Sequence, residues 1–215
     1  MGPHGVSELE APIRLRGRPD LALVLGNRWR SIVDSLRSRV DRLTHSRARR
    51  RARTRLDRAR LPRRILIVCD GNICRSPYAE AYLRRRLNDA GRQDVEVGSA
   101  GFFGPDRPAN ERGYAIAMLR GVDLGNHRSR LIQRAAAPQA DLVLVMTRRQ
   151  REELIRRFGV SPERVELLGD FDPTDPPWRE IPDPYGQSEE FFQQVFGQIE
   201  RSIHGFWAIL IKLPR

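Results

Sequence analysis

Residues 65–77, Ile-Leu-Ile-Val-Cys-Asp-Gly-Asn-Ile-Cys-Arg-Ser-Pro, constrain the fold more than any other stretch of this chain. Four apolar residues, three of them β-branched, precede Cys69 and favour a strand that is covered on both faces. The Gly71-Asn72 pair then permits a tight backbone turn, and Ser76 and Pro77 are typical of the N-cap and first residue of a helix. The sequence therefore predicts a strand, a compact loop and a helix whose N-terminus faces that loop.

This predicted loop has the features of an oxyanion site beside a reactive cysteine. Its backbone N–H groups and the positive end of the helix would converge on one point, which favours a bound anion. Cys69 would lie beside these amides and Arg75, and such surroundings stabilise a thiolate at neutral pH. The guanidinium of Arg75 can bind two phosphate oxygens at once, which a lysine could not do. We therefore expect Cys69 to be a nucleophile that attacks a phosphate held by the loop.

The string Val-Cys-x-Gly-Asn-Ile-Cys-Arg-Ser-Pro at residues 68–77 resembles the signature of the low-molecular-weight protein tyrosine phosphatases. It lies between the apolar strand and a helical pattern at 78–87, as it does in that family. The resemblance extends from Arg63 to near the C-terminus. Further segments that follow in the family's order lie at 97–101, 121–128, 141–146 and 181–185.

The resemblance implies a phosphotyrosine phosphatase that uses a cysteinyl-phosphate intermediate. Cys69 would be the nucleophile, Arg75 would hold the equatorial oxygens, and Asp183 would protonate the leaving phenolate. Ser76 would donate a hydrogen bond to the thiolate, and Cys74 would be the second loop cysteine, able to form a reversible disulfide with Cys69. The residues expected to bind phosphate or to support the loop are Asp70, Gly71, Asn72, Ile73, Cys74, Ser76, Ser99 and His127.

The depth of the pocket is expected to select phosphotyrosine. Phosphoserine and phosphothreonine are too short to reach a phosphate site at the bottom of a cleft walled by Tyr185 and by Phe102 or Phe103. Aromatic walls would also stack on the phenyl ring. The loop with Phe102 and Phe103 is shorter than the common family version and lacks its usual tryptophan, which leaves the peptide preference open. Neither a metal ion nor a cofactor is expected.

Three alternatives compete with this interpretation. Thioredoxin-coupled arsenate reductases have the same fold but need further cysteines downstream, and this chain contains only Cys69 and Cys74. Protein arginine phosphatases carry a threonine where Ile73 stands, and this single position favours the tyrosine phosphatase. From a different class of function, the chain could be a phosphate-loop binding module whose basic arm binds membrane or nucleic acid.

Strand-like and helix-like segments alternate after residue 63. Strands are predicted at 65–69, 95–99, 141–146 and 165–168, and helices at about 77–90, 110–121, 147–158 and 188–211. This order predicts an α/β fold, a doubly wound four-stranded parallel sheet with helices on both faces. Cys69 would then lie at the carboxyl end of a strand, where such folds place their sites.

The charge of the chain is uneven and indicates two parts. Residues 1–64 contain 18 Arg and 6 Asp or Glu, a surplus of +12, whereas the remainder has 21 basic and 21 acidic residues. We therefore divide the chain into a basic, helical or disordered N-terminal extension at 1–61 and a phosphatase domain at 62–215. Within the extension, apolar residues spaced by three and four predict an amphipathic helix at about 20–43, followed by an Arg-rich linker at about 44–61.

The extension leaves several partners open. Its amphipathic helix could pack on the catalytic domain or on its own copy, or lie on an anionic membrane surface. Residues 47–64 could be a solvated helix or a disordered linker. Two features argue against nucleic acid as a partner: this run has no interleaved aromatic residues, and Lys212 is the only lysine, which points to a general arginine bias.

The expected location is the cytoplasm, and the expected substrate is a phosphotyrosine protein. Residues 1–20 are polar, Leu21 to Leu25 is too short an apolar run for a secretory signal, and no segment approaches the length of a membrane span. An unpaired reactive thiolate also favours a reducing compartment. A bacterial tyrosine kinase is one candidate partner that the resemblance implies.

Overall fold

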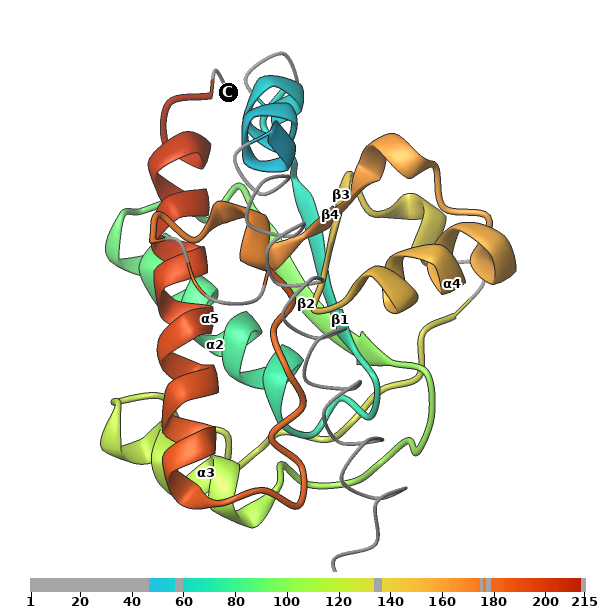
Figure 1. The fold of residues 1–215 in the computed structure, drawn as a ribbon. Helices are drawn as coiled ribbons and strands as arrows, with labels where there is room; N and C mark the ends of the chain where they lie inside the picture. Colours follow the sequence, from blue (N-terminus) through green and yellow to red (C-terminus); the bar gives the residue numbers. More distant parts are fainter. Residues whose placement is uncertain (1–46, 57–59, 134–136, 175, 177–178, 214–215) are drawn as a thin grey trace, which may run out of the picture. The chain divides into compact units, whose positions relative to one another are not determined.

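A computed structural model describes residues 47–56, 60–133, 137–174, 176 and 179–213 of the chain (Figure 1). All described residues belong to one compact unit, Ser38–Arg215. The amphipathic helix predicted at 20–43 lies outside the described residues.

The centre of this unit is a four-stranded parallel sheet. Its strands are β1 (Arg64–Cys69), β2 (Glu96–Gly101), β3 (Leu142–Val145) and β4 (Val165–Leu167), in the spatial order β2-β1-β3-β4. The predicted doubly wound sheet is confirmed. From β1 the chain crosses to β2 on one side, and it then returns to β3 on the other side of β1. The topological switch point therefore lies at the carboxyl ends of β1 and β3.

Helices cover both faces of the sheet. The helices α2 (Arg75–Asp89), α3 (Glu111–Leu119) and α5 (Glu189–Leu210) lie on one face, and α4 (Arg148–Phe158) lies on the other (Figure 1). Successive residues of β3 show why both faces are apolar: Leu144 packs with the first group of helices, while Val143 and Val145 pack with α4. Such continuous apolar strands are typical of parallel sheets, whose side chains are buried on both sides.

Short 3₁₀ helices and capped helix ends complete the connections. The 3₁₀ segments are η1 (Ala137–Gln139), η2 (Pro162–Arg164) and η3 (Leu168–Phe171). Ser188 caps α5 by accepting a hydrogen bond from the Phe191 N–H at 3.3 Å, so the long helix begins where the sequence predicts it.

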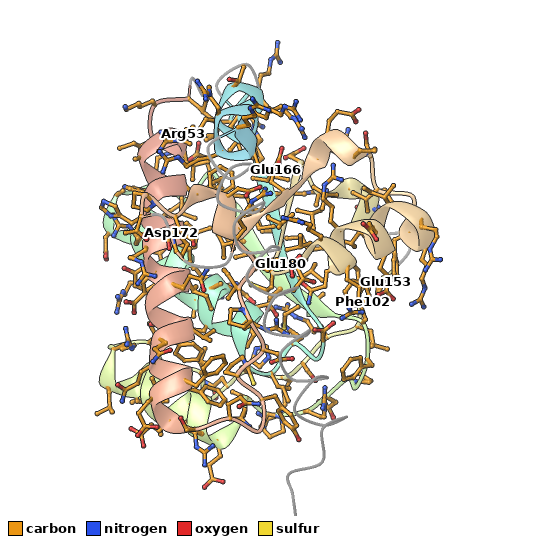
Figure 2. All side chains as sticks on the ribbon, in the orientation of Figure 1. Arg53, Phe102, Glu153, Glu166, Asp172 and Glu180 are labelled. Atoms are coloured by element: carbon orange, nitrogen blue, oxygen red, sulfur yellow. The ribbon has the colours of Figure 1, made fainter. Side chains whose placement is uncertain are left out.

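Residues 47–56 form a helix that packs on the core beside α5. Ala52 and Leu56, four residues apart, are buried in the same core as α5. Arg49 donates to the Asp172 carbonyl oxygen at 3.3 Å, and Arg55 forms a 2.9 Å ion pair with Glu166. Asp172 and Glu166 are labelled in Figure 2. Of the two alternatives for residues 47–64, a solvated helix or a disordered linker, the structure shows a helix over residues 47–56, and its apolar residues Ala52 and Leu56 are buried against the core. The domain boundary at residue 62 stays a prediction.

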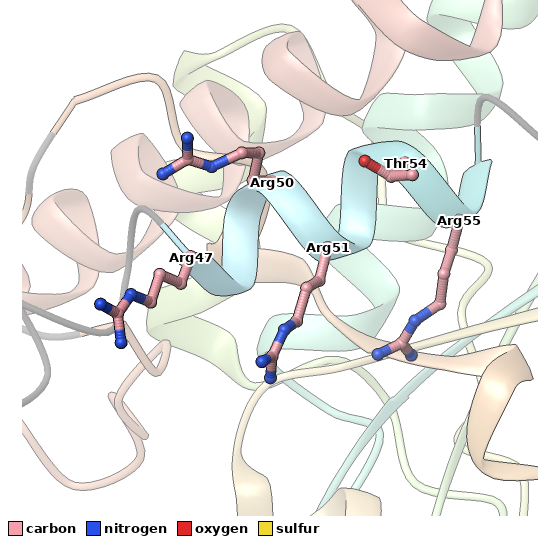
Figure 3. Close-up of a pocket in the computed structure, with 5 residues that line it drawn as sticks. All are labelled: Arg47, Arg50, Arg51, Thr54 and Arg55. Atoms are coloured by element: carbon pink, nitrogen blue, oxygen red, sulfur yellow. The ribbon is translucent and has the colours of Figure 1, made fainter.

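Several arginines of this helix face solvent together. Figure 3 shows Arg47, Arg51 and Arg55 on one side of it, at a spacing of four residues, and Arg50 on another side. Within the described part of the chain, Arg55 is the member of this set that pairs with a carboxylate.

Glu166 on β4 makes stability depend on pH. Its side chain is 8% exposed, and burial raises its pKa to about 7, although Arg55 opposes this shift. An unfolded Glu has a pKa of about 4.3, so the native state binds the proton more tightly than the unfolded chain. The stability that this group contributes is therefore present at low pH and is lost as pH rises toward 7.

The variant Glu166→Gln should remove this dependence. We expect the free energy of unfolding of the wild type to fall relative to that of the variant by about 2–3 kcal/mol between pH 5 and pH 8. Urea unfolding of both proteins at the two pH values measures the difference. Two curves that stay parallel across this range would show that the buried carboxyl does not titrate there.

Candidate active site

The loop between β1 and α2 forms the floor of a pocket of about 230 Å³. Cys69 is the last residue of β1, so it lies at the switch point of the sheet. The pocket is lined by Cys69, Asp70, Gly71, Ile73, Cys74, Arg75, Phe103, Arg107, Asp183 and Tyr185. The residues come from three parts of the chain that are far apart in sequence.

Helix α2 begins earlier than predicted. It starts at Arg75, and the preceding Cys74 makes no side-chain cap, so the assignment of Ser76 as N-cap and Pro77 as first residue is corrected. The physical reason is that the Ser76 hydroxyl has other partners. Its oxygen lies 3.0 Å from the Cys69 sulfur and accepts a hydrogen bond from Asn72 Nδ2 at 2.8 Å. Because Asn72 donates to this oxygen, the serine proton is available to the sulfur.

Asn72 holds the loop in shape with every polar atom of its side chain. Its φ of 51° is left-handed, a region that Asn tolerates better than most residues. Nδ2 also donates to the Ser99 hydroxyl at 2.8 Å, and Oδ1 accepts from the Arg130 N–H at 2.8 Å. The Asn72 carbonyl oxygen lies 2.7 Å from Nε2 of His127. Burial lowers the pKa of His127, which favours a neutral ring that donates from Nε2.

Glu80 extends this network and was not predicted. The Ser99 hydroxyl donates to its carboxylate, which is buried and also faces Arg84 and Arg130. A chain of hydrogen bonds therefore runs from Glu80 through Ser99, Asn72 and Ser76 to Cys69. Ser76 and Glu80 are four residues apart on one face of α2, and this spacing is the feature of the sequence that could have placed Glu80 near the loop.

Arg75 is 2% exposed and links the loop to the segment that carries Asp183. Its Nη2 lies 2.9 Å from Asp70 Oδ2 and 2.7 Å from Asp183 Oδ2, and its Nη1 donates to the Ile181 carbonyl oxygen at 3.1 Å. Its Nε is buried with no hydrogen-bond partner among the described residues. A buried donor without a partner costs about 1–3 kcal/mol, and a bound oxyanion would remove that cost. The site therefore fits a phosphate group.

Asp70 is the second carboxylate that holds the guanidinium of Arg75 in place. Its carboxylate also accepts from Gln150 Nε2 at 3.0 Å and from Arg149, both near the start of α4. The loop is thus tied to the helix on the opposite face of the sheet. The sequence predicted Asp70 only as a supporting residue, and the structure shows that it does so through ion pairs with Arg75 and Arg149.

Asp183 differs from the other Asp-Pro pairs in its surroundings. It is 46% exposed, lines the pocket and contacts Arg75. Asp172 is fully buried and accepts from the Thr174 hydroxyl and from Arg201, which makes it a structural residue. The Ile181 N–H donates to the Met146 carbonyl oxygen at 2.9 Å, which places the Asp183 segment at the end of β3.

Cys74 lies in the pocket as a free thiol, and Cys69 is also free. Burial raises the pKa of Cys74 to about 12, with smaller contributions of the same sign from Cys69 and Asp183. Cys74 is therefore protonated at neutral pH, in contrast to the thiolate that the chemistry requires of Cys69.

Phe103 and Tyr185 form the aromatic walls. They are 57% and 61% exposed and both line the pocket. The assignment of Phe102 to the pocket is corrected: its ring lies 5.9 Å from that of Phe158 on the α4 side of the sheet (Figure 2). β2 ends at Gly101 and the chain bends at both phenylalanines, so that Phe103 lines the pocket and Phe102 packs on the α4 side.

Comparison with known proteins agrees with this geometry. The family described as low molecular weight phosphotyrosine protein phosphatase matches residues 64–213. The chain belongs to this family. The resemblance, the fold and the assignment as a hydrolase of phosphotyrosine are thereby confirmed.

Relatives cover the phosphatase domain almost completely. The chain is 37% identical to the phosphatase Etp of Escherichia coli K12 over 142 residues. This match covers 64% of this chain and 88% of Etp. The tyrosine phosphatase Wzb from Escherichia coli K30, solved with sulphate, is 34% identical with a TM-score of 0.61, over 68% of this chain and 96% of Wzb. The YwlE arginine phosphatase from Geobacillus stearothermophilus is 31% identical with a TM-score of 0.59, over 67% and 90%.

Among the helices of the described ranges, none has the length and apolar character that crossing a bilayer requires.

Proposed function

We propose that Cys69, Arg75 and Asp183 hydrolyse phosphotyrosine in two phosphoryl-transfer steps. The observation that carries this proposal is their meeting in one pocket, in which the Nε of Arg75 is buried and has no hydrogen-bond partner among the described residues. Arg75 and the loop amides hold the equatorial oxygens as charge develops on them. Asp183 reaches the same pocket from the other side of the guanidinium.

In the first step the Cys69 sulfur attacks phosphorus and the bond from phosphorus to the phenolic oxygen breaks. Asp183 gives its proton to that oxygen, so tyrosine leaves as a neutral phenol. In the second step the Asp183 carboxylate takes a proton from water, whose oxygen attacks phosphorus. The sulfur leaves as a thiolate that accepts a hydrogen bond from Ser76, and inorganic phosphate is released.

The ion pair between Arg75 and Asp183 prepares this proton transfer. A phosphate bound to Arg75 competes with the Asp183 carboxylate for Nη2. Substrate binding therefore releases Asp183 from its ion pair with Arg75, so that its carboxyl group can serve the leaving oxygen.

Phosphotyrosine rather than phosphoarginine is the substrate that the pocket residues favour. Ile73 lines the pocket at the position where the resemblance gives arginine phosphatases a threonine, and Phe103 and Tyr185 provide walls for a phenyl ring. Turnover of matched phosphotyrosine and phosphoarginine peptides tests this choice. A higher kcat/KM for phosphoarginine would move the assignment to the arginine phosphatases.

We place this activity in the cytoplasm, with a phosphotyrosine protein of the bacterial tyrosine kinase class as the proposed partner. The two free cysteines in one pocket support a reducing compartment. An Asp183→Asn variant that retains bound phosphoprotein can identify the partner from a cell extract by mass spectrometry.

For the N-terminal extension we propose an anionic membrane surface or a second copy of the chain as partner. The solvent-facing arginines of residues 47–56 support an anionic partner (Figure 3). Sedimentation with anionic and neutral vesicles, and the molar mass in solution, compared with a chain that lacks residues 1–46, separates the two.

Replacement of the proposed acid, Asp183→Asn, should lower kcat about 10²–10⁴-fold for substrates whose leaving group needs a proton. The loss should be much smaller for aryl phosphates with acidic phenols, since these leave without protonation. A series of aryl phosphates of graded phenol acidity measures the dependence. The control Asp89→Asn, at the exposed end of α2, should behave as wild type. An equal loss for every leaving group would assign Asp183 a role other than general acid.

A further inference from the structure

Some charged side chains that line the pocket are paired with an opposite charge, and one is not. Asp70 pairs with Arg75 and Arg149, and Arg75 pairs with both Asp70 and Asp183. Arg107 also lines the pocket, yet it forms no ion pair with any carboxylate of the described residues. The pocket therefore has one arginine whose charge is not neutralised by the protein. The proposed catalytic steps make no use of it.

A dedicated cradle holds this arginine in place. Its Nε donates to the Gly104 carbonyl oxygen at 2.9 Å, and its Nη2 donates to the Gly71 oxygen at 3.0 Å and the Phe103 oxygen at 3.3 Å. A side chain at Gly71 would lie 2.8 Å from Nη2, and one at Gly104 would lie 2.5 Å from the guanidinium. Both glycines thus leave the space that the guanidinium fills. The main chain is fixed as well, because the Arg107 N–H donates to the Ser129 hydroxyl at 2.9 Å.

The cradle leaves part of the guanidinium unused. Nη1 makes no hydrogen bond to the described residues, so its two N–H groups can bind a ligand. The guanidinium carbon lies 5.7 Å from the centre of the Phe103 ring, which itself forms a wall of the pocket. A phenyl ring that packs on Phe103 would therefore have a fixed positive charge beside it.

We infer that Arg107 determines peptide specificity by binding an acidic group next to the phosphotyrosine, either a carboxylate or a second phosphate. This inference rests on the proposed function, because it assumes that the phosphotyrosine occupies the pocket. A guanidinium forms strong, charge-assisted hydrogen bonds with carboxylates and phosphates. Neutral acceptors hold Arg107 on one side, so its charge remains available to a substrate on the other.

A purely structural role is the competing explanation. The bond to the Gly71 carbonyl could simply support the phosphate loop, and its loss would then lower turnover of every substrate alike. The two roles differ in the ratio of kcat/KM between acidic and neutral peptides, which a general loss of activity does not change.

The test measures this ratio with the full chain. Three matched peptides carry one phosphotyrosine flanked by neutral residues, by Asp or Glu, or by a second phosphotyrosine. The variants are Arg107→Gln, Arg107→Lys and Arg107→Glu. Arg164→Gln is the control, because it removes one exposed positive charge at η2 on the opposite edge of the sheet. This control is needed because a chain of net charge +12 attracts acidic peptides without specific contacts.

For wild type and Arg164→Gln we expect kcat/KM to be about 5- to 10-fold higher for an acidic peptide, mainly through KM. Arg107→Gln should bring the ratio close to one, Arg107→Lys should retain part of it, and Arg107→Glu should invert it. A preference for the doubly phosphorylated peptide alone would show that Arg107 binds a phosphate. A preference for both acidic peptides would show that it binds a carboxylate as well as a phosphate.

An unchanged ratio in Arg107→Gln, with kcat reduced equally for all peptides, would overturn the inference and leave the proposed function intact. A wild type that cleaves all three peptides equally would do the same. If the wild type cleaves no phosphotyrosine peptide, the proposed function fails and this inference falls with it.

Discussion

Replacing Cys69 by serine is expected to abolish turnover of aryl phosphates, with kcat falling at least about 10⁴-fold. Serine has nearly the same shape and would keep the contact with Ser76. Its hydroxyl, however, is not ionised at neutral pH, and the neighbouring carboxylate of the loop, Asp70, is paired with Arg75 and Arg149. The loss would therefore report the chemistry of the sulfur and not a change in the fold.

The measurement combines kinetics with a direct search for the intermediate. Mass spectrometry of wild type quenched during turnover should place one phosphoryl group on Cys69. Thermal unfolding of Cys69→Ser should match that of the wild type, which shows that the fold is retained. Cys74→Ser should lose far less activity, because Cys74 is a protonated thiol in the same pocket. Phosphorus found on another side chain, or activity that survives Cys69→Ser, would refute the proposed mechanism.

The parts of the site that lie close together in sequence could be predicted. Residues 65–77 specify a strand, a turn and a helix start by local rules, and the motif contains the proposed nucleophile and its arginine. The alternation of apolar segments likewise predicted all four strands, with ends that differ by at most two residues. These features depend on β-branched runs and glycine positions, which act over short distances.

Contacts between polar residues far apart in sequence could not be predicted in this way. The pairing of Arg75 with Asp183 spans more than a hundred residues, and the contact of Arg107 with Gly71 depends on how two loops meet. In a chain with 39 basic residues, no local pattern separates an arginine that lines a pocket from one that faces solvent. The direction of Phe102 was missed for a related reason, because it depends on how the chain bends after the end of β2.

The second large effect is expected from Arg75→Lys, which keeps the positive charge but should lower kcat/KM about 10³-fold or more. Arg75 makes three contacts through two nitrogens and holds Nε free for the substrate. A lysine ammonium cannot contact Asp70 and two phosphate oxygens from one fixed position. Inorganic phosphate and vanadate, as competitive inhibitors, should therefore bind more weakly to the variant.

A chemical rescue separates this role from a general loss of structure. Arg75→Ala leaves a space beside Asp70, and added guanidinium ion should restore part of the activity, whereas ammonium should not, because only the planar fork matches two phosphate oxygens. Arg149→Lys is the matched control, since it changes a 64% exposed arginine that contacts the same aspartate. Equal rescue by both ions, or an Arg75→Lys enzyme close to wild type, would mean that charge alone holds the phosphate. The buried fork geometry of Arg75 would then have no catalytic consequence.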